Sequence, residues 1–193
     1  MKKDFLLALI AGLIAGVFLF PTLRYIELKV PFENLLLLIV LPLGSGLFIW
    51  FVGTFGQRFF QFGKFFVAGG LNFVVFFGVL NLLMAQTGIT EGFGFSLFSA
   101  LSFIIANINS YLWNKFWTFS MQSNVEAGEY VKFLIVSAVS LALTVGVASF
   151  IVNVVRPQFG IEPKLWANIG AAFGSIVALL ANFFGYKFFV FRK

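Results

Sequence analysis

Six long apolar runs separated by short connections constrain the fold of this chain more than any other feature. About 20 consecutive apolar residues are enough for a helix to cross the hydrocarbon core of a bilayer. A helix satisfies its own backbone hydrogen bonds in lipid, and the runs lack the alternation that is typical of membrane strands. The sequence therefore predicts an all-α polytopic membrane bundle with six transmembrane helices, at residues 5–23, 34–53, 64–87, 96–114, 130–153 and 165–186.

The composition agrees with a membrane protein, because only 10% of the residues are charged, whereas soluble domains carry about 25%. Cysteine and histidine are absent, which excludes thiolate and imidazole metal sites, cysteine nucleophiles and histidine bases. We expect no metal, no other cofactor and no nucleic-acid partner. The net charge of +6 favours contact with anionic lipid headgroups on the cytoplasmic side.

The first run has two interpretations. Lys2 and Lys3 resemble the basic start of a secretory signal peptide. No small-residue cleavage site follows them, however, and the apolar run is longer than that of a typical signal peptide. A retained transmembrane helix is therefore the preferred interpretation.

Basic residues are divided unequally between the two sides of the predicted helices. One side holds nine of them: Lys2, Lys3, Arg58, Lys64, Lys115, Lys132, Lys187, Arg192 and Lys193. The other side holds four: Arg24, Lys29, Arg156 and Lys164. Because cytoplasmic connections carry the excess of Lys and Arg, we expect the cytoplasmic membrane as the location and both termini in the cytoplasm.

Two segments, residues 64–119 and 132–191, look like tandem copies of one helical hairpin. Both begin with Lys-Phe, Gly78 and Gly146 lie at the same offset, and the copies end in "WNKFWTF" and "GYKFFVF". Parallel repeats of this kind often form a transporter site at their interface, although chance similarity of apolar helices is the alternative. We therefore expect a four-helix domain at residues 61–193.

Residues 1–60 are expected to form an accessory N-terminal hairpin with an interfacial linker. Gly12 and Gly16 have the spacing of small residues at close helix contacts. In the linker, residues 54–64, basic and aromatic side chains recur on different faces. This pattern fits either a short helix in the headgroup layer or an ordinary basic loop.

Polar side chains gather near the ends of the fourth and sixth runs. Asn107, Ser110, Tyr111 and Asn114 share one helical face by their spacing. Hydrogen bonds between helices, worth about 0.6–2 kcal/mol each, are the alternative to ligand binding. We prefer that alternative for the serine and threonine side chains, and ligand binding for the asparagines of the fourth and sixth runs. The candidate ligand-binding residues are Asn72, Asn107, Ser110, Tyr111, Asn114, Lys115, Trp117, Asn182, Tyr186 and Lys187.

Lys115 and Lys187 occupy matched positions in the two predicted copies. They either anchor the helix ends in the headgroup layer, with Trp117 and Tyr186 as interfacial aromatics, or act as point charges facing a phosphate. In the second interpretation, asparagine amides would hold sugar hydroxyls or phosphate oxygens, and aromatic rings would pack on a sugar face. The residues alone leave both open.

Several function classes are disfavoured. All seven acidic residues lie near the ends of the runs or in connections, which argues against a proton antiporter because such proteins usually need an ionisable group in mid-membrane. The chain has no acidic cluster for metal-assisted glycosyl transfer, no nucleotide-binding motif and no charged ring for an ion channel. We therefore expect a non-enzymatic protein.

The endings of the two hairpins resemble those of the GtrA-like family, over about residues 60–193. The first ending matches at Ser110, Tyr111, Asn114, Lys115, Trp117 and Phe119. The second ending matches at Asn182, Phe183, Lys187, Phe189 and Phe191. Tyr186 departs from the pattern, because the family more often has Asn there, and the family form has four spans rather than six.

The resemblance implies a membrane protein that moves polyprenyl-phosphate-linked sugars, or one that supports the glycosyltransferases that make or use them. The leading hypothesis is flipping of a polyprenyl phosphate carrying one sugar, for cell-surface polysaccharide or glycoconjugate synthesis. The alternative is a non-catalytic scaffold that recruits a glycosyltransferase. The two added N-terminal spans are expected to make contacts within a homo-oligomer or to dock such an enzyme.

Overall fold

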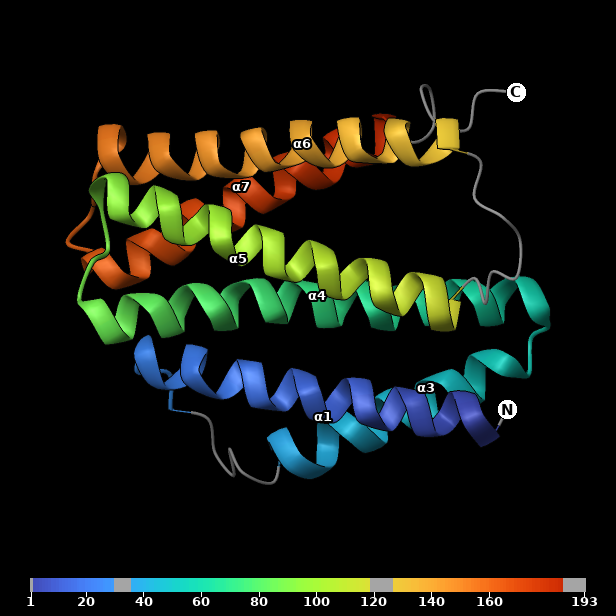
Figure 1. Cartoon of the computed structure of the whole chain (residues 1–193). Helices are drawn as coiled ribbons and strands as arrows, with labels where there is room; N and C mark the ends of the chain where they lie inside the picture. The colour runs from blue at the N-terminus through green and yellow to red at the C-terminus, as the bar shows by residue number, and fades with distance from the viewer. Residues whose placement is uncertain (1, 30–35, 119–126, 186–193) are drawn as a thin grey trace. The chain divides into compact units, whose positions relative to one another are not determined.

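The chain is described by a computed structural model that places residues 2–29, 36–118 and 127–185 (Figure 1). Every regular element within these residues is a helix. In chain order the elements are α1 (Lys2–Tyr25), η1 (Leu36–Val40), α3 (Leu41–Gly53), α4 (Gln57–Thr87), α5 (Gly92–Trp113), η2 (Asn114–Thr118), α6 (Ala127–Ser149), η3 (Phe150–Val155) and α7 (Pro163–Gly185). The three η elements are π-helical segments, each adjoining an α-helix.

The six α-helices of the described residues occupy the six predicted runs, which confirms the predicted helical membrane bundle. Large apolar side chains are exposed along these helices, as on surfaces that face lipid. The second run holds a shorter apolar helix, Leu37–Gly53. Within the described residues, four helical segments are long and apolar enough to cross a membrane: Lys2–Tyr25, Phe59–Thr87, Gly92–Thr118 and Ile135–Val155.

The linker before α4 differs from both predicted forms. Thr54 to Gly56 make a short turn, in which Gly56 adopts a positive φ of 104° that favours glycine. Gln57 then begins α4. Most of the linker is therefore the first part of a long helix, rather than a separate helix in the headgroup layer or a loop.

The chain divides into two compact units. Unit 1 comprises Met1–Leu82 and Ile105–Gln122, and unit 2 comprises Leu83–Ile104 and Ser123–Lys193. The predicted division at residue 61 into an accessory hairpin and a four-helix domain stays a prediction.

In unit 1, α1 packs against η1 and α3 through small residues. A Cβ atom at Gly12 would collide with the carbonyl oxygen of Leu41, and one at Gly16 with the carbonyl oxygen of Leu37. Ser45 Oγ donates a hydrogen bond to the carbonyl of Ala8 at 2.6 Å across the same contact. The spacing of Gly12 and Gly16 therefore marks a real helix contact, as predicted, because small residues let helix backbones approach closely.

At one end of unit 1, four helices meet around an apolar cluster. Ala8 from α1, Ile49 from α3 and Trp117 from η2 form its buried centre. Phe60 from α4 and Trp113 from α5 pack against it. The start of α1, the end of α3, the start of α4 and the end of α5 thus lie together (Figure 1).

In unit 2, α6 packs against α7 through a second pair of glycines at the same spacing. A Cβ atom at Gly174 would collide with the carbonyl oxygen of Thr144, and one at Gly170 would press on Val152 and on the Ala148 carbonyl oxygen. The Trp166 indole donates to the Ile151 carbonyl at 3.0 Å, which satisfies an acceptor within η3. This close contact holds the second helix pair together.

Candidate functional site

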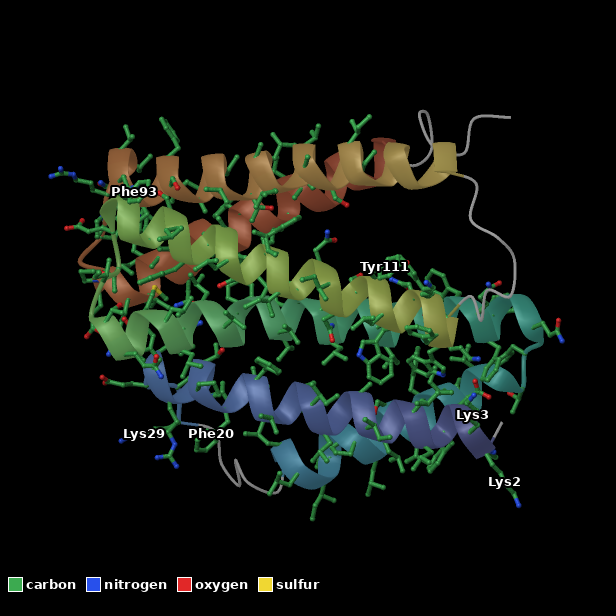
Figure 2. The ribbon with its side chains drawn as sticks, viewed as in Figure 1. Lys2, Lys3, Phe20, Lys29, Phe93 and Tyr111 are labelled. Carbon is green, nitrogen blue, oxygen red and sulfur yellow. The ribbon has the colours of Figure 1, made fainter. Side chains whose placement is uncertain are left out.

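The polar face predicted on the fourth run lies at the carboxyl-terminal end of α5. Asn107, Ser110 and Asn114 are half-buried, and Tyr111 is 37% exposed. Figure 2 labels Tyr111 on this part of α5, whereas Phe93 marks the opposite end of the helix. Asn114 Nδ2 donates to Ser110 Oγ at 3.2 Å. The amide and the hydroxyl therefore lie on one face, one helical turn apart.

Lys115 places a positive charge beside this face. Its ammonium group donates to the Tyr111 hydroxyl at 3.2 Å and lies 5.4 Å from the centre of the Tyr111 ring and 5.6 Å from that of Phe116. These contacts hold the cation at the exposed end of the helix. Among the described residues it forms no ion pair, so its charge is available to an anionic ligand.

The π-helical segment η2 determines in which direction the side chains after Trp113 point. A π turn contains more residues than an α turn, so it rotates the side chains after it relative to the α-helical pattern, and such turns are frequent at functional sites. Lys115 and Phe116 are exposed here, while Trp117 and Thr118 are buried. The π turn thus separates an outward-facing cation from an inward-facing tryptophan.

Trp117 lies in the apolar cluster of unit 1 rather than on an open surface. It is 2% exposed, and its ring meets the Trp113 ring edge-on at 5.4 Å. Ala8 and Ile49 complete its surroundings. A sugar ring could not stack on a face covered in this way, so we take Trp117 as a packing residue and leave it out of the proposed ligand contacts.

Several buried polar atoms have no hydrogen-bond partner among the described residues, and most of them belong to α5 and η2. Burying an amide or hydroxyl without a partner costs about 1–3 kcal/mol by protein mutational data, so such atoms call for a physical reason. The atoms are Asn72 Oδ1, Ser99 Oγ, Ser102 Oγ, Asn109 Nδ2, Asn114 Oδ1 and Thr118 Oγ1.

Three hydroxyl side chains on α6 and α7 behave differently, because they bond to their own helix. Ser140 donates to the Val136 carbonyl at 2.9 Å, and Thr144 donates to the Ser140 carbonyl at 2.8 Å. Ser175 donates to the Ala171 carbonyl at 2.9 Å. These hydroxyls are satisfied without a ligand, as the packing interpretation of the fifth run expects.

Lys64, the basic residue that opens the first predicted repeat, is neutralised within unit 1. It forms an ion pair with Asp4 of α1, and the two side chains are only 11% and 18% exposed. Its ammonium also lies 4.5 Å from the centre of the Phe60 ring. This lysine therefore connects α4 to α1, and among the described residues of unit 1 Lys115 is the better placed cation for a ligand.

Three of the candidate residues cannot be placed. Asn182 lies in α7, but its side chain is outside the described residues, as are Tyr186 and Lys187. Asn72 lies in α4 and is half-buried. The structure thus brings Asn114 into contact with Ser110 and Lys115 into contact with Tyr111, and a shared ligand site with the second hairpin stays a prediction.

An open cleft of about 300 Å³ lies near the start of α1 in unit 1, where Figure 2 labels Lys2 and Lys3. Its lining is Lys2, Phe5, Ile49, Trp50 and Phe60. None of these belongs to the predicted ligand-binding set, and only Lys2 among them is polar. The described residues contain no group of acidic side chains that could hold a metal ion.

The long apolar helices, together with the polar carboxyl-terminal end of α5, define a polytopic helical membrane protein. Residues 64–191 match the family model described as GtrA/DPMS, transmembrane domain, and the match covers about two thirds of the chain. The chain belongs to this family, a family of membrane proteins involved in glycoconjugate synthesis. The match confirms the resemblance seen in the sequence, and it begins at Lys64 and ends at Phe191, the limits of the predicted tandem repeats. No solved structure matches the chain.

Proposed function

We propose that the protein moves a polyprenyl phosphate carrying one sugar across the cytoplasmic membrane, for cell-surface polysaccharide or glycoconjugate synthesis. One observation carries the proposal beyond family membership. At the end of α5, the exposed ammonium of Lys115 lies beside an amide, Asn114, whose buried Oδ1 has no partner among the described residues. A cation next to unpartnered amide atoms suits an anion that carries hydroxyl groups.

The roles of the residues follow from their chemistry. Lys115 is a point charge for the phosphate, while Asn107 and Asn114 each offer an amide donor and acceptor for sugar hydroxyls. Ser110 orients Asn114 through their hydrogen bond. The polyprenyl tail stays in the bilayer, against the exposed apolar side chains of the helices.

The physical task of such a protein is to replace water around the headgroup. Moving an ion from water into hydrocarbon is prohibitive, at tens of kcal/mol on an idealised estimate. Amide and ammonium groups substitute for the hydration shell, and transport follows the concentration gradient of the lipid. The protein itself makes and breaks no covalent bond.

Reconstitution in liposomes tests the proposal. The probe is a short-chain isoprenyl phosphate carrying glucose, galactose or mannose, and membrane-impermeant periodate reports the sugar exposed on the outer leaflet. We expect wild-type protein to make inner-leaflet probe accessible, and Asn114→Ala to slow this by about tenfold, since one or two hydrogen bonds are lost. Gln158→Ala, in an exposed connection, is the control and should retain the wild-type rate.

The scaffold alternative makes the opposite prediction. Folded wild-type protein would then give the same accessibility as protein-free liposomes, and a glycosyltransferase would co-purify with wild type and with Asn114→Ala alike. That pair of results would overturn the transport proposal.

A further inference from the structure

We infer that Ser99 and Ser102 form a second, deeper binding position for the sugar of the transported headgroup. This inference rests on the proposed function and extends it to residues that are not among the candidates at the end of α5. Both serines are completely buried, at 0% exposure, and neither hydroxyl has a partner among the described residues.

Their bonding state separates these serines from others of equal burial. Ser140 is 1% exposed and bonds to the Val136 carbonyl of its own helix. A serine in a helix can make this bond in a suitable side-chain rotamer, yet Ser99 and Ser102 do not. Their hydroxyls are therefore free to bond to something other than their own helix.

The position of the two serines along α5 links them to the end of the helix. Ser99 and Ser102 are three residues apart, and Asn109 follows Ser102 by seven, so the three share one face. From Asn114 to Ser99 the helix rises by about 22 Å, most of the roughly 30 Å hydrocarbon thickness. A headgroup that passes along this face from Asn109 would meet Ser102 and then Ser99.

The side chains at this deeper position suit the sugar of the headgroup better than its phosphate. Serine hydroxyls are neutral donors and acceptors, and between Gly92 and Trp113 helix α5 has no charged residue. Hydroxyl groups of an uncharged sugar match such partners, whereas a phosphate would lack a counter-charge there on α5. The ligand class is therefore the polyhydroxylated, uncharged part of the lipid headgroup.

Two contacts near the start of α5 join this helix to the end of α6 and to η3 within unit 2. Ser96 Oγ and Ser149 Oγ lie 2.6 Å apart, joining α5 to the end of α6. The Gly92 backbone N–H donates to Asn153 Oδ1 at 2.5 Å. Because Ser99 and Ser102 are themselves 0% exposed, they must become uncovered when a headgroup passes.

Thiol labelling tests this directly, because the chain has no cysteine. Ser102→Cys is compared with Ala148→Cys, a fully buried position on α6, using a small charged thiosulfonate on reconstituted protein. We expect Ser102→Cys to react about tenfold faster or more, and the isoprenyl phosphate–hexose probe to slow that reaction by a similar factor, as for competition at a shared site. Equal rates for the two variants would overturn the inference.

Transport by the double variant Ser99→Ala/Ser102→Ala provides a second readout. We expect a rate about tenfold below wild type, for two lost hydrogen bonds, while Ser140→Ala stays within about twofold because its hydroxyl serves its own helix. A double variant that transports at the wild-type rate overturns the deeper position and leaves the proposed function intact. Failure of folded wild type to transport overturns both.

Discussion

At the scale of single residues, the same side chain has different roles depending on its partner. Asn81 is fully buried and donates to the Phe77 carbonyl of its own helix at 2.8 Å, so its burial needs no ligand. Asn114 bonds only through its nitrogen to Ser110, and its oxygen has no partner among the described residues. Hydrogen-bond satisfaction, rather than residue type, marks the asparagines that are available to a ligand.

The ion pair between Asp4 and Lys64 leads to a prediction about stability. Replacing Asp4 by Asn leaves the Lys64 ammonium without its counter-charge. The burial of this ion pair is intermediate between that of surface pairs and that of fully buried pairs. We expect a loss of about 1–3 kcal/mol in unfolding free energy, measured as a lower thermal midpoint in detergent. The double variant Asp4→Asn/Lys64→Met should recover much of the loss, because it leaves no unpaired charge.

An exposed ion pair of the same chain is the matched control. Lys164 and Glu162 lie 3.2 Å apart, and the Glu162 side chain is 66% exposed. Glu162→Gln should change the midpoint little, since exposed pairs contribute about 0–1 kcal/mol. Equal effects of Asp4→Asn and Glu162→Gln would contradict a structural role for the Asp4–Lys64 pair.

The sequence predicted part of this residue-level picture. The spacing of Ser110 and Asn114 correctly indicated that they share one face, because helical periodicity is a local property. The pairing of Asp4 with Lys64 was not predicted, because the two are far apart in the chain and only tertiary packing brings them together. The packing role of Trp117 was missed as well, since a π turn leaves no periodic signal in the sequence.

At the scale of helices, two pairs of glycines bring neighbouring helices into close contact. The pair on α1, Gly12 and Gly16, was recognised from its spacing. The pair on α7, Gly170 and Gly174, has the same spacing and was not singled out, although the signal was present. Both pairs lie against backbone atoms of a neighbouring helix, the arrangement by which small residues favour helix association in lipid.

Replacing two glycines of unit 2 by alanine, one at a time, tests the close contact between α6 and α7. Gly174→Ala would place a methyl group against the Thr144 carbonyl oxygen, and we expect a loss of about 1–3 kcal/mol, as for other overpacked sites. Gly146→Ala on α6 meets nothing within 4 Å and should be neutral or gain up to about 1 kcal/mol from helix propensity. Thermal unfolding in detergent measures both, and a Gly174→Ala midpoint at or above that of Gly146→Ala would refute the close contact.

Helix positions were predicted better than helix irregularities. The predicted runs agree with the helices because a bilayer demands long apolar segments, which are visible in the sequence. The start of α4 at Gln57 was missed, because polar and aromatic residues in its first turns resemble an interfacial linker. The π-helical segments were also missed, since they depend on how neighbouring helices pack.

At the scale of the molecule, the two predicted repeats are not equivalent. Gly78 and Gly146 hold the same position in the two copies, yet a Cβ atom at Gly78 would press on Phe18 of α1, whereas one at Gly146 would meet no atom of the described residues within 4 Å. Together with the Asp4–Lys64 pair, this shows that α1 packs on the first hairpin within unit 1. The added N-terminal helices are thus an integral part of that unit, and a role for them in oligomer or enzyme docking stays a prediction.

Orientation in the membrane connects this architecture to the proposed function, and single thiols can establish it. Gln57, at the start of α4, and Gln158, between α6 and α7, are both exposed. The distribution of basic residues predicts that, in sealed spheroplasts of a bacterial host, impermeant maleimide labels Gln158→Cys directly but Gln57→Cys only after permeabilisation. Phe60 near the start of α4 shares an apolar cluster with Trp117, so Gln57 reports the side on which Lys115 lies. The reverse labelling pattern would put Lys115 at the outer leaflet, where it could not receive a headgroup from the cytoplasmic side.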